Sequence, residues 1–458
     1  MDTLPGNAFL EGPITLPLLK FTLPLALALI LQALYGAVDM AVVGHLGTTA
    51  DVAAVGIGSL IMQALTAVIA GLSMGVTVRL GHAVGAGDLD RAGRTVGASL
   101  LLTLLGTLLL TLPMIFLAPA LVGLMSAPPP SFGIASDYVR ICSSGLLFIL
   151  AYNVIAGVFR GVGDSRSPPL FVAVSCGVNA LADLYFVGGL GMGARGAACA
   201  TVLSQGVGVA FSLLYIRRRK LGLPVMRGWG DGCFRELLLI LKVGLPVASQ
   251  DLLNYLSFMI LVSIVNAMGL LAAAAIAVEG KLFAFFSLIP ISFMSALSAF
   301  VAQNMGAGKP ERAVRALQRG VAVALAVGCL TLSLALFCGE FLASLFTENP
   351  EAVRATARFL KGGCLEHLCL AVVFCMLGYF NGISRTLFVV IQGAVCAFLV
   401  RIPLAAWLSR SAGQDLIVMG WTLSFSAFVG LLQCVAYFFW CQNRRERGGC
   451  GEAPSPSP

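Results

Sequence analysis

Long apolar runs, each about the length of one membrane crossing, follow one another along nearly the whole chain. A hydrocarbon core about 30 Å thick needs roughly 20 apolar residues in a helix, and the sequence contains about twelve such runs. Their centres lie near Leu29, Ala67, Leu105, Leu150, Cys176, Gly208, Ile260, Leu288, Leu325, Val373, Leu399 and Leu431. The pattern predicts an all-α integral membrane protein with about twelve transmembrane helices.

Composition supports a lipid-facing surface. Of 458 residues, 59% are hydrophobic and only 11% are charged. A soluble protein of this length would need far more charged residues to cover its core. The 13 cysteines are scattered along the apolar runs without a CxxC or a metal-ligand spacing. We interpret them as small apolar residues, and we expect neither a disulfide framework nor a metal site.

Basic residues gather in alternate gaps between the runs, whereas the opposite gaps are nearly empty apart from Arg195 and Arg410. The gathered residues are Arg79, Arg91, Arg94, Arg160, Arg166, Arg217, Arg218, Arg219, Lys220, Arg227, Arg235, Lys309, Arg312, Arg315, Arg319, Arg385, Arg444, Arg445 and Arg447. This positive-inside pattern predicts a multi-pass protein of the plasma (inner) membrane with both termini in the cytoplasm. It also explains the formal net charge of +8 without a nucleic-acid partner.

The chain repeats itself. Residues 19–47, "LKFTLPLALALILQALYGAVDMAVVGHLG", match residues 241–269 without a gap, and "GAGDLDRA" at 85–92 matches "GAGKPERA" at 306–313. In each copy of the second motif, Gly suits the end of one helix, and the following residues suit the start of the next. Parallel repeats of six helices are typical of transporters. The predicted domains are a first six-helix bundle at 1–216, a cytoplasmic basic linker at 217–235, a second six-helix bundle at 236–445 and a disordered tail at 446–458.

Two aspartates stand inside spans of the first half. An ionisable residue at a helix centre costs roughly 2.5–3.5 kcal/mol on insertion scales, so Asp39 and Asp183 are candidates for function. Asn179 lies four residues before Asp183, and Tyr35 lies four residues before Asp39, so each pair shares a helical face. With Thr201 they form a set that can satisfy a carboxylate in either protonation state. A proton and a cationic ligand would compete for the same negative charge, which is sufficient for antiport.

Further polar residues complete the candidate set. Gln32, Asn153 and Gln205 are possible residues of a substrate cavity, and Ser204 is a further possible partner for the first-half site. In the second half the candidates for a second cation site are Asp251, Asn254, Glu279 and Glu366. Glu279 alternatively pairs with Lys281 or Arg401, and the sequence leaves both readings open. We expect Glu340 near a helix end, and His45 and His82 in loops.

No motif for a catalytic reaction or a nucleotide is present. "GMGARG" at 191–196 fits G-x-G-x-x-G, but a helix-length apolar run precedes it and no acid follows at the required spacing. "GAGKPE" lacks the GK[ST] of a phosphate-binding loop. We therefore expect no enzyme activity, no cofactor and no metal, and we expect an ion gradient as the energy source.

Four stretches together resemble one transporter family. They are "DMAVVGHLG" at the end of the first run, "VGAGDLDRA" after the second, "FRGVGDSRSP" at 159–168, and "NALAD" followed by "GMGARGAACAT", which ends on Thr201. From about Pro17 to Arg445 the chain resembles the multidrug and toxic compound extrusion (MATE) family. Its first half is similar to the DinF-like branch.

The resemblance implies a V-shaped pair of pseudo-symmetric six-helix bundles that exports organic cations and amphiphilic drugs by alternating access. It also implies that Asp39, Asp183, Asn179 and Thr201 form a site for a proton or cation. Another branch carries a carboxylate on the seventh helix, where this chain has Asn254. Asp251 and Glu366 are possible substitutes, so the coupling ion is either H⁺ or Na⁺.

The predicted function is therefore secondary active multidrug export by cation-coupled antiport, with a monomer sufficient for the architecture. The main alternative is a flippase for a lipid-linked precursor, for which Arg401 is the candidate phosphate-binding residue and against which the two first-half aspartates argue. An ion channel and an intramembrane enzyme are further alternatives. The channel should show a pore-lining repeat, and the enzyme lacks a nucleophile or metal motif.

Overall fold

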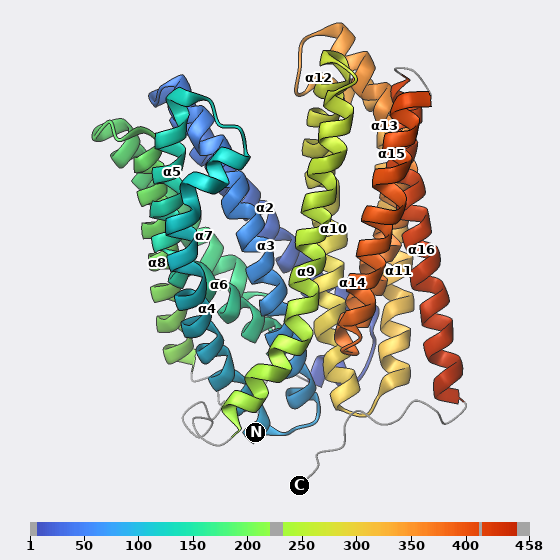
Figure 1. Ribbon diagram of the computed structural model, residues 1–458. Helices are drawn as coiled ribbons and strands as arrows, with labels where there is room; N and C mark the ends of the chain where they lie inside the picture. The colour runs from blue at the N-terminus through green and yellow to red at the C-terminus, as the bar shows by residue number, and fades with distance from the viewer. Residues whose placement is uncertain (1–6, 220–231, 412–414, 447–458) are drawn as a thin grey trace. The chain divides into compact units, whose positions relative to one another are not determined.

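The computed structural model describes residues 7–219, 232–411 and 415–446, and these are almost entirely helical (Figure 1). The elements are α1 (Asn7–Leu10), α2 (Thr15–Leu46), α3 (Thr49–Gly85), α4 (Leu89–Leu124), α5 (Pro129–Ser144), α6 (Leu146–Val162), α7 (Ser167–Asp183), the π-helix η1 (Leu184–Gly189), α8 (Gly193–Arg219), α9 (Cys233–Asn266), α10 (Leu270–Gly306), α11 (Pro310–Phe337), α12 (Gly339–Ser344), α13 (Pro350–Gly382), α14 (Thr386–Ala394), the π-helix η3 (Val395–Arg401), α15 (Ile402–Ser411) and α16 (Leu416–Glu446). Most of the predicted linker and nearly all of the predicted tail lie outside the described residues.

The described helices account for every predicted apolar run. Eleven helices are long and apolar enough to cross a membrane, and the pair α5 and α6 supplies a twelfth span with a bend of 52°. The bend lies at Gly145, where a side chain would overlap Val202 of α8. The fourth predicted run is therefore a broken span, and its break lies where the chain passes close to α8. The prediction of an all-α membrane protein with twelve spans is confirmed.

The repeated glycine motif ends a helix in both halves, as the sequence predicts. α3 ends at Gly85 and α10 ends at Gly306. Two residues later in each copy, Gly87 and Gly308 have φ values of 71° and 67°. This left-handed conformation strains any residue with a side chain, so the repeat encodes the same chain reversal twice.

By their internal packing the described residues form two compact units, which differ from the expected halves. The first contains the chain up to Leu252 together with Ile291–Arg319 and Gly378–Thr386. The second contains Leu253–Pro290, Gly320–Leu377 and the chain from Leu387. The first unit thus includes parts of α9, α10, α11 and α13, which belong to the second half of the repeat.

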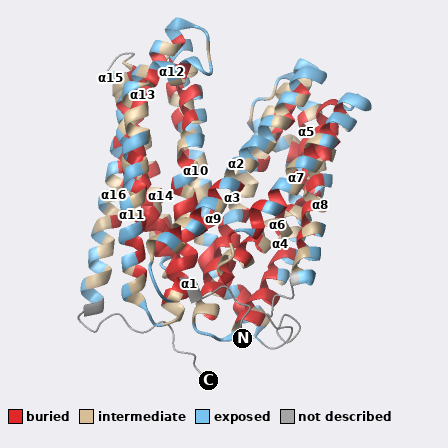
Figure 2. Ribbon diagram, turned by 180° about the vertical axis from the view of Figure 1, so that it is seen from behind, coloured by how far each residue is buried: buried red, intermediate tan, exposed pale blue. Residues whose placement is uncertain are grey.

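A seam of glycines on α3 explains why these segments join the first unit. A side chain at Gly71 would overlap the backbone of Ala248, one at Gly75 would overlap Ile240, and one at Gly85 would overlap Gln303. Small residues let helix backbones approach closely in membranes. α3 is consequently buried on all sides between Gly71 and Val78. Figure 2 colours the described helices by burial, with the buried segments in red.

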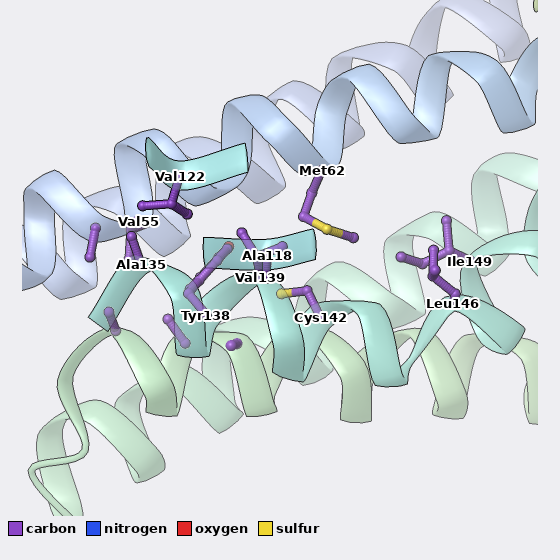
Figure 3. Close-up of a cluster of buried hydrophobic side chains, with 14 of the residues drawn as sticks. Val55, Met62, Ala118, Val122, Ala135, Tyr138, Val139, Cys142, Leu146 and Ile149 are labelled. Carbon is purple, nitrogen blue, oxygen red and sulfur yellow. The ribbon is translucent and has the colours of Figure 1, made fainter. Parts of the chain in front are cut away.

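A hydrophobic cluster fixes the other end of α3 in the first unit (Figure 3). Met62 of α3 lies opposite Tyr138 and Cys142 of α5, with Ala118 and Val122 of α4 packed beside them. Cys142 is a free thiol, as is every other cysteine in the described part of the chain. The buried Cys142 thus packs among apolar side chains, as the sequence predicts.

Candidate functional site

Two buried carboxyl groups face each other in the first unit. Asp39 lies on α2 and is 4% exposed, and Asp183 is the last residue of α7 and is fully buried. The two carboxyl groups lie close enough to interact electrostatically. Among the described residues, neither carboxyl group takes part in an ion pair. The site therefore carries up to two negative charges without a basic side chain to balance them.

Polar groups from three helices complete the site, because α2, α7 and α8 pack against one another. The Tyr35 hydroxyl lies 2.8 Å from Ser204 Oγ and donates to the carbonyl oxygen of Thr201 at 3.5 Å. Asn179 is fully buried one turn before Asp183. The structure thus brings the five predicted residues of this site onto three contacting helices, and it selects Ser204 as a further partner.

Several buried polar atoms of this site lack a hydrogen-bond partner of good geometry among the described residues. They are Oδ1 of Asp39, both carboxyl oxygens of Asp183, both amide atoms of Asn179 and Oγ1 of Thr201. A buried polar atom without a partner costs roughly 1–3 kcal/mol. Most of these atoms are oxygens, whose lone pairs can accept a proton or coordinate a small hard cation. The arrangement is chemically suited to reversible binding of such an ion.

Irregular backbone positions the site. Directly after Asp183 the chain forms the π-helix η1, and π-helical turns are rare and frequent at functional sites. The loop after η1 is tied to α3, since Asp51 Oδ1 accepts a hydrogen bond from the backbone N of Ala194 at 2.9 Å. A side chain at Gly193, whose φ is 55°, would overlap the same carboxylate. The start of α8 is thereby fixed, two turns before Thr201.

The three predicted cavity residues lie on different helices of the first unit. Gln32 on α2 is exposed and its side chain hydrogen-bonds Tyr152, which the sequence analysis missed. Asn153 on α6 donates to the carbonyl oxygen of Ile149 at 2.9 Å, and Gln205 on α8 is half-buried. Their role in binding a substrate stays a prediction.

The second unit contains a different group of buried charges. Glu279 on α10 and Glu366 on α13 are each 3% exposed. The two carboxyl groups interact electrostatically with each other and with the guanidinium of Arg401, the last residue of η3. Lys281 instead lies over the ring of Phe346, 5.6 Å from its centroid. Of the two basic partners considered for Glu279, Arg401 is therefore the one that interacts with it electrostatically, and the described residues show no direct ion pair between the two.

The remaining second-half candidates lie on α9. Asp251 is half-buried and belongs to the first unit, whereas Asn254, one turn later, belongs to the second. The grouping of these two residues with Glu279 and Glu366 stays a prediction. The structure assigns only the two glutamates and Arg401 to one cluster.

The expectation for the two histidines was wrong. His45 and His82 lie in the last turns of α2 and α3, not in loops, because both helices continue beyond their apolar runs. His82 Nε2 lies 2.8 Å from the carbonyl oxygen of Gly382. Glu340 is exposed in the first turn of α12, as expected of a residue near a helix end.

A buried ion pair in the first unit was missed. Arg79 of α3 donates to both carboxylate oxygens of Glu236 on α9, at 3.1 and 3.0 Å, and the two side chains are only 12% and 10% exposed. Arg91 approaches the same carboxylate at 3.6 Å. The sequence places Arg79 and Arg91 in a gap expected to face the cytoplasm, but a partner 157 positions away leaves no local signal.

Comparisons with known proteins agree with this architecture. The sequence profile of the MatE family matches residues 24–185 and 246–407, one segment in each repeat. The chain is 26% identical over 439 residues to the "Probable multidrug resistance protein YpnP" of Bacillus subtilis (strain 168), covering 95% of this chain and 97% of that protein. It is 26% identical to the "FAD transporter" of Shewanella oneidensis, covering 87% and 89%.

A solved structure has the same fold. It is described as the "Outward-facing conformation of a multidrug resistance MATE family transporter of the MOP superfamily", and it superposes with a TM-score of 0.87 at 22% identity over 97% of this chain and 98% of that one. Since the family profile covers well over half of the sequence and its two segments coincide with the two repeats, the chain belongs to the MatE family of membrane transporters.

Proposed function

We propose that the protein exports organic cations and amphiphilic drugs across the plasma (inner) membrane in exchange for H⁺ or Na⁺. The observation that carries this proposal is the buried pair Asp39 and Asp183, which has no basic partner among the described residues. The names of the relatives, which refer to multidrug resistance, support the substrate class. Both termini face the cytoplasm in this proposal, as the distribution of basic residues indicates.

The coupling follows from electrostatics. Two adjacent buried carboxylates repel each other, and burial penalises their charge, so the pair holds a proton or a small cation on the side where that ion is abundant. A cationic drug competes for the same negative charge. Loading of the drug therefore favours release of the ion, and the opposite exchange occurs after the site opens to the other side. A conformational change is driven only by such differential binding.

The second cluster plays no equivalent part in this mechanism. Arg401 lies beside Glu279 and Glu366 and balances part of their charge. The same contacts make Arg401 a weak candidate for holding the phosphate of a lipid-linked precursor. We therefore retain cation-coupled drug export as the proposed function.

The test is efflux of a fluorescent organic cation from proteoliposomes, driven by an imposed pH gradient or an imposed Na⁺ gradient. We expect efflux by the wild-type protein under one gradient and loss of that efflux in Asp183→Asn. Glu340→Gln is the matched control, because it neutralises an exposed acid in the first turn of α12. Normal gradient-driven efflux by Asp183→Asn would reject the carboxyl pair as the coupling site.

A further inference from the structure

A cavity of about 460 Å³ lies in the first unit. It is lined by the start of α2, by the loop and first turn leading into α7, and by Tyr215 near the end of α8. The residues preceding α2, including Phe9 and Pro13, form another of its walls. None of the residues proposed for drug or ion binding lines it.

The rim of this cavity is basic. Lys20 and Arg166 are both exposed, and neither takes part in an ion pair among the described residues. Asp164 is the only acid among the lining residues, and its carboxylate is already used at the start of α7. It accepts from the backbone N of Arg166 at 2.8 Å and of Ser167 at 3.1 Å, and from the Ser167 hydroxyl at 2.6 Å. The two cations are therefore available to an anionic ligand.

The inner wall is apolar and firmly held. Phe9 is 5% exposed, and its ring packs at 4.9 Å from the ring of Phe21 and at 4.8 Å from that of Phe300. The Arg312 guanidinium donates to the carbonyl oxygens of Phe9, Glu11 and Gly12 at 2.8–2.9 Å. The segment that contains Phe9 is thus held in place by hydrogen bonds from Arg312 to its backbone. Leu16, 54% exposed, extends the apolar surface along the outside of α2.

We propose that this cavity binds the phosphate headgroup of an anionic phospholipid, with the start of an acyl chain along the apolar wall. An inorganic phosphate would match the two cations but would leave the apolar wall unused. Basic pockets between membrane helices on the cytoplasmic side are suited to anionic headgroups, which are concentrated in that leaflet. The choice of leaflet rests on the proposed orientation, whereas the binding itself does not depend on drug export.

The experiment is a binding titration of the purified full chain with phosphatidylglycerol, followed by native mass spectrometry. Phosphatidylcholine and inorganic phosphate serve as the comparison ligands. The test variant is Lys20→Gln/Arg166→Gln. The matched control is Lys242→Gln/Arg319→Gln, which removes two exposed cations of the same unit that do not line the cavity. A second test variant, Leu16→Trp, fills the cavity and leaves its charges unchanged.

We expect saturable binding of phosphatidylglycerol that is roughly 10–30-fold weaker in the rim variant and unchanged in the control. Leu16→Trp should also weaken binding. Equal binding to all variants, or equal binding of phosphatidylcholine, would overturn the proposal. Competition by inorganic phosphate at a comparable concentration would show a free-phosphate site and would likewise reject the lipid. Since the readout is binding, a failure here is distinguishable from a failure of the drug-export proposal.

Discussion

The two buried acidic groups of this transporter differ in how their charge is balanced. In the first unit, Asp39 and Asp183 interact with each other, and neither forms an ion pair among the described residues. In the second unit, Glu279 and Glu366 share the positive charge of Arg401. A carboxyl pair without a fixed cation can take up an ion from solution, whereas in the second group Arg401 already balances one of the two negative charges. We therefore propose a single exchangeable site, in the first half of the repeat.

A π-helix lies next to each of the two acidic groups. The π-helix η1 follows Asp183, and the π-helix η3 ends at Arg401. Both belong to the fifth span of their repeat, so each half has a π-helix at the corresponding place. What differs is the charge placed there, an acid in one half and a base in the other. Divergence between the halves has therefore changed the side chains more than the fold.

The largest expected effect distinguishes the two groups by transport. We expect Asp39→Asn to lower gradient-driven efflux at least about tenfold, since charge-assisted interactions of roughly 1.5–3 kcal/mol are lost. Glu279→Gln should retain most of the wild-type rate, because Arg401 still balances the charge of Glu366 electrostatically. Initial efflux rates from proteoliposomes measure both. A reversed order would move the exchangeable site to the second unit.

The next effect is on stability. Arg401→Gln leaves Glu279 and Glu366 without a cation, and we expect the free energy of unfolding in detergent micelles to fall by about 3 kcal/mol. Adding Glu366→Gln should recover at least half of that loss, because one of the two uncompensated carboxylates is removed. Denaturant titration of the single and double variants gives the answer. A double variant no more stable than Arg401→Gln would show that the arginine acts through packing alone.

A smaller effect on the ion dependence of efflux is expected at Tyr35, a neutral residue beside the first carboxyl group. Tyr35→Phe removes the hydroxyl that lies 2.8 Å from Ser204 Oγ. Hydrogen bonds between membrane helices average about 0.6 kcal/mol, so we expect a threefold or smaller rise in the coupling-ion concentration for half-maximal efflux. Tyr185→Phe, at a tyrosine 61% exposed on η1, is the control. An effect as large as that of Asp39→Asn would make the hydroxyl a direct ligand of the ion.

The smallest effect tests the choice between the two basic residues near Glu279. Lys281→Met removes a cation that lies over Phe346, a contact worth about 0.5–1 kcal/mol at an exposed site. We expect a loss of unfolding free energy within that range and an unchanged ion dependence of efflux. If Lys281→Met destabilises as much as Arg401→Gln, the lysine is the true counter-charge of the glutamates.

Much of the fold was readable from the sequence because the bilayer sets the length of each span and penalises charge within it. The twelve runs and the candidates Asp39 and Asp183 follow from these two constraints, whereas the repeated glycine turn follows from the internal repeat and Asn179 from its helical spacing to Asp183. The residues of the first-half site could be grouped from the sequence because pairs of them share a helical face, and helical spacing is a local property of the chain.

What escaped prediction depends on contacts between distant segments. The sequence offered both Lys281 and Arg401 to Glu279, and only the packed structure places Arg401 beside it. The position of His82 inside α3, and the pairing of Arg79 with Glu236, depend in the same way on where helices meet. The π-helix after Asp183 has no compositional signature, since an extra residue in a helical turn is a response to packing.

The glycine seam of α3 has a consequence for variation in this chain. At Gly71, Gly75 and Gly85 the neighbouring helix occupies the volume that a side chain would need. No side chain fits at these positions, so even alanine, the smallest possible replacement, is already too large. By contrast, an added methyl group at Gly36 on α2 meets nothing within 4 Å. A comprehensive substitution scan should therefore reveal a stripe of intolerant positions on one helix that no hydrophobicity scale would single out.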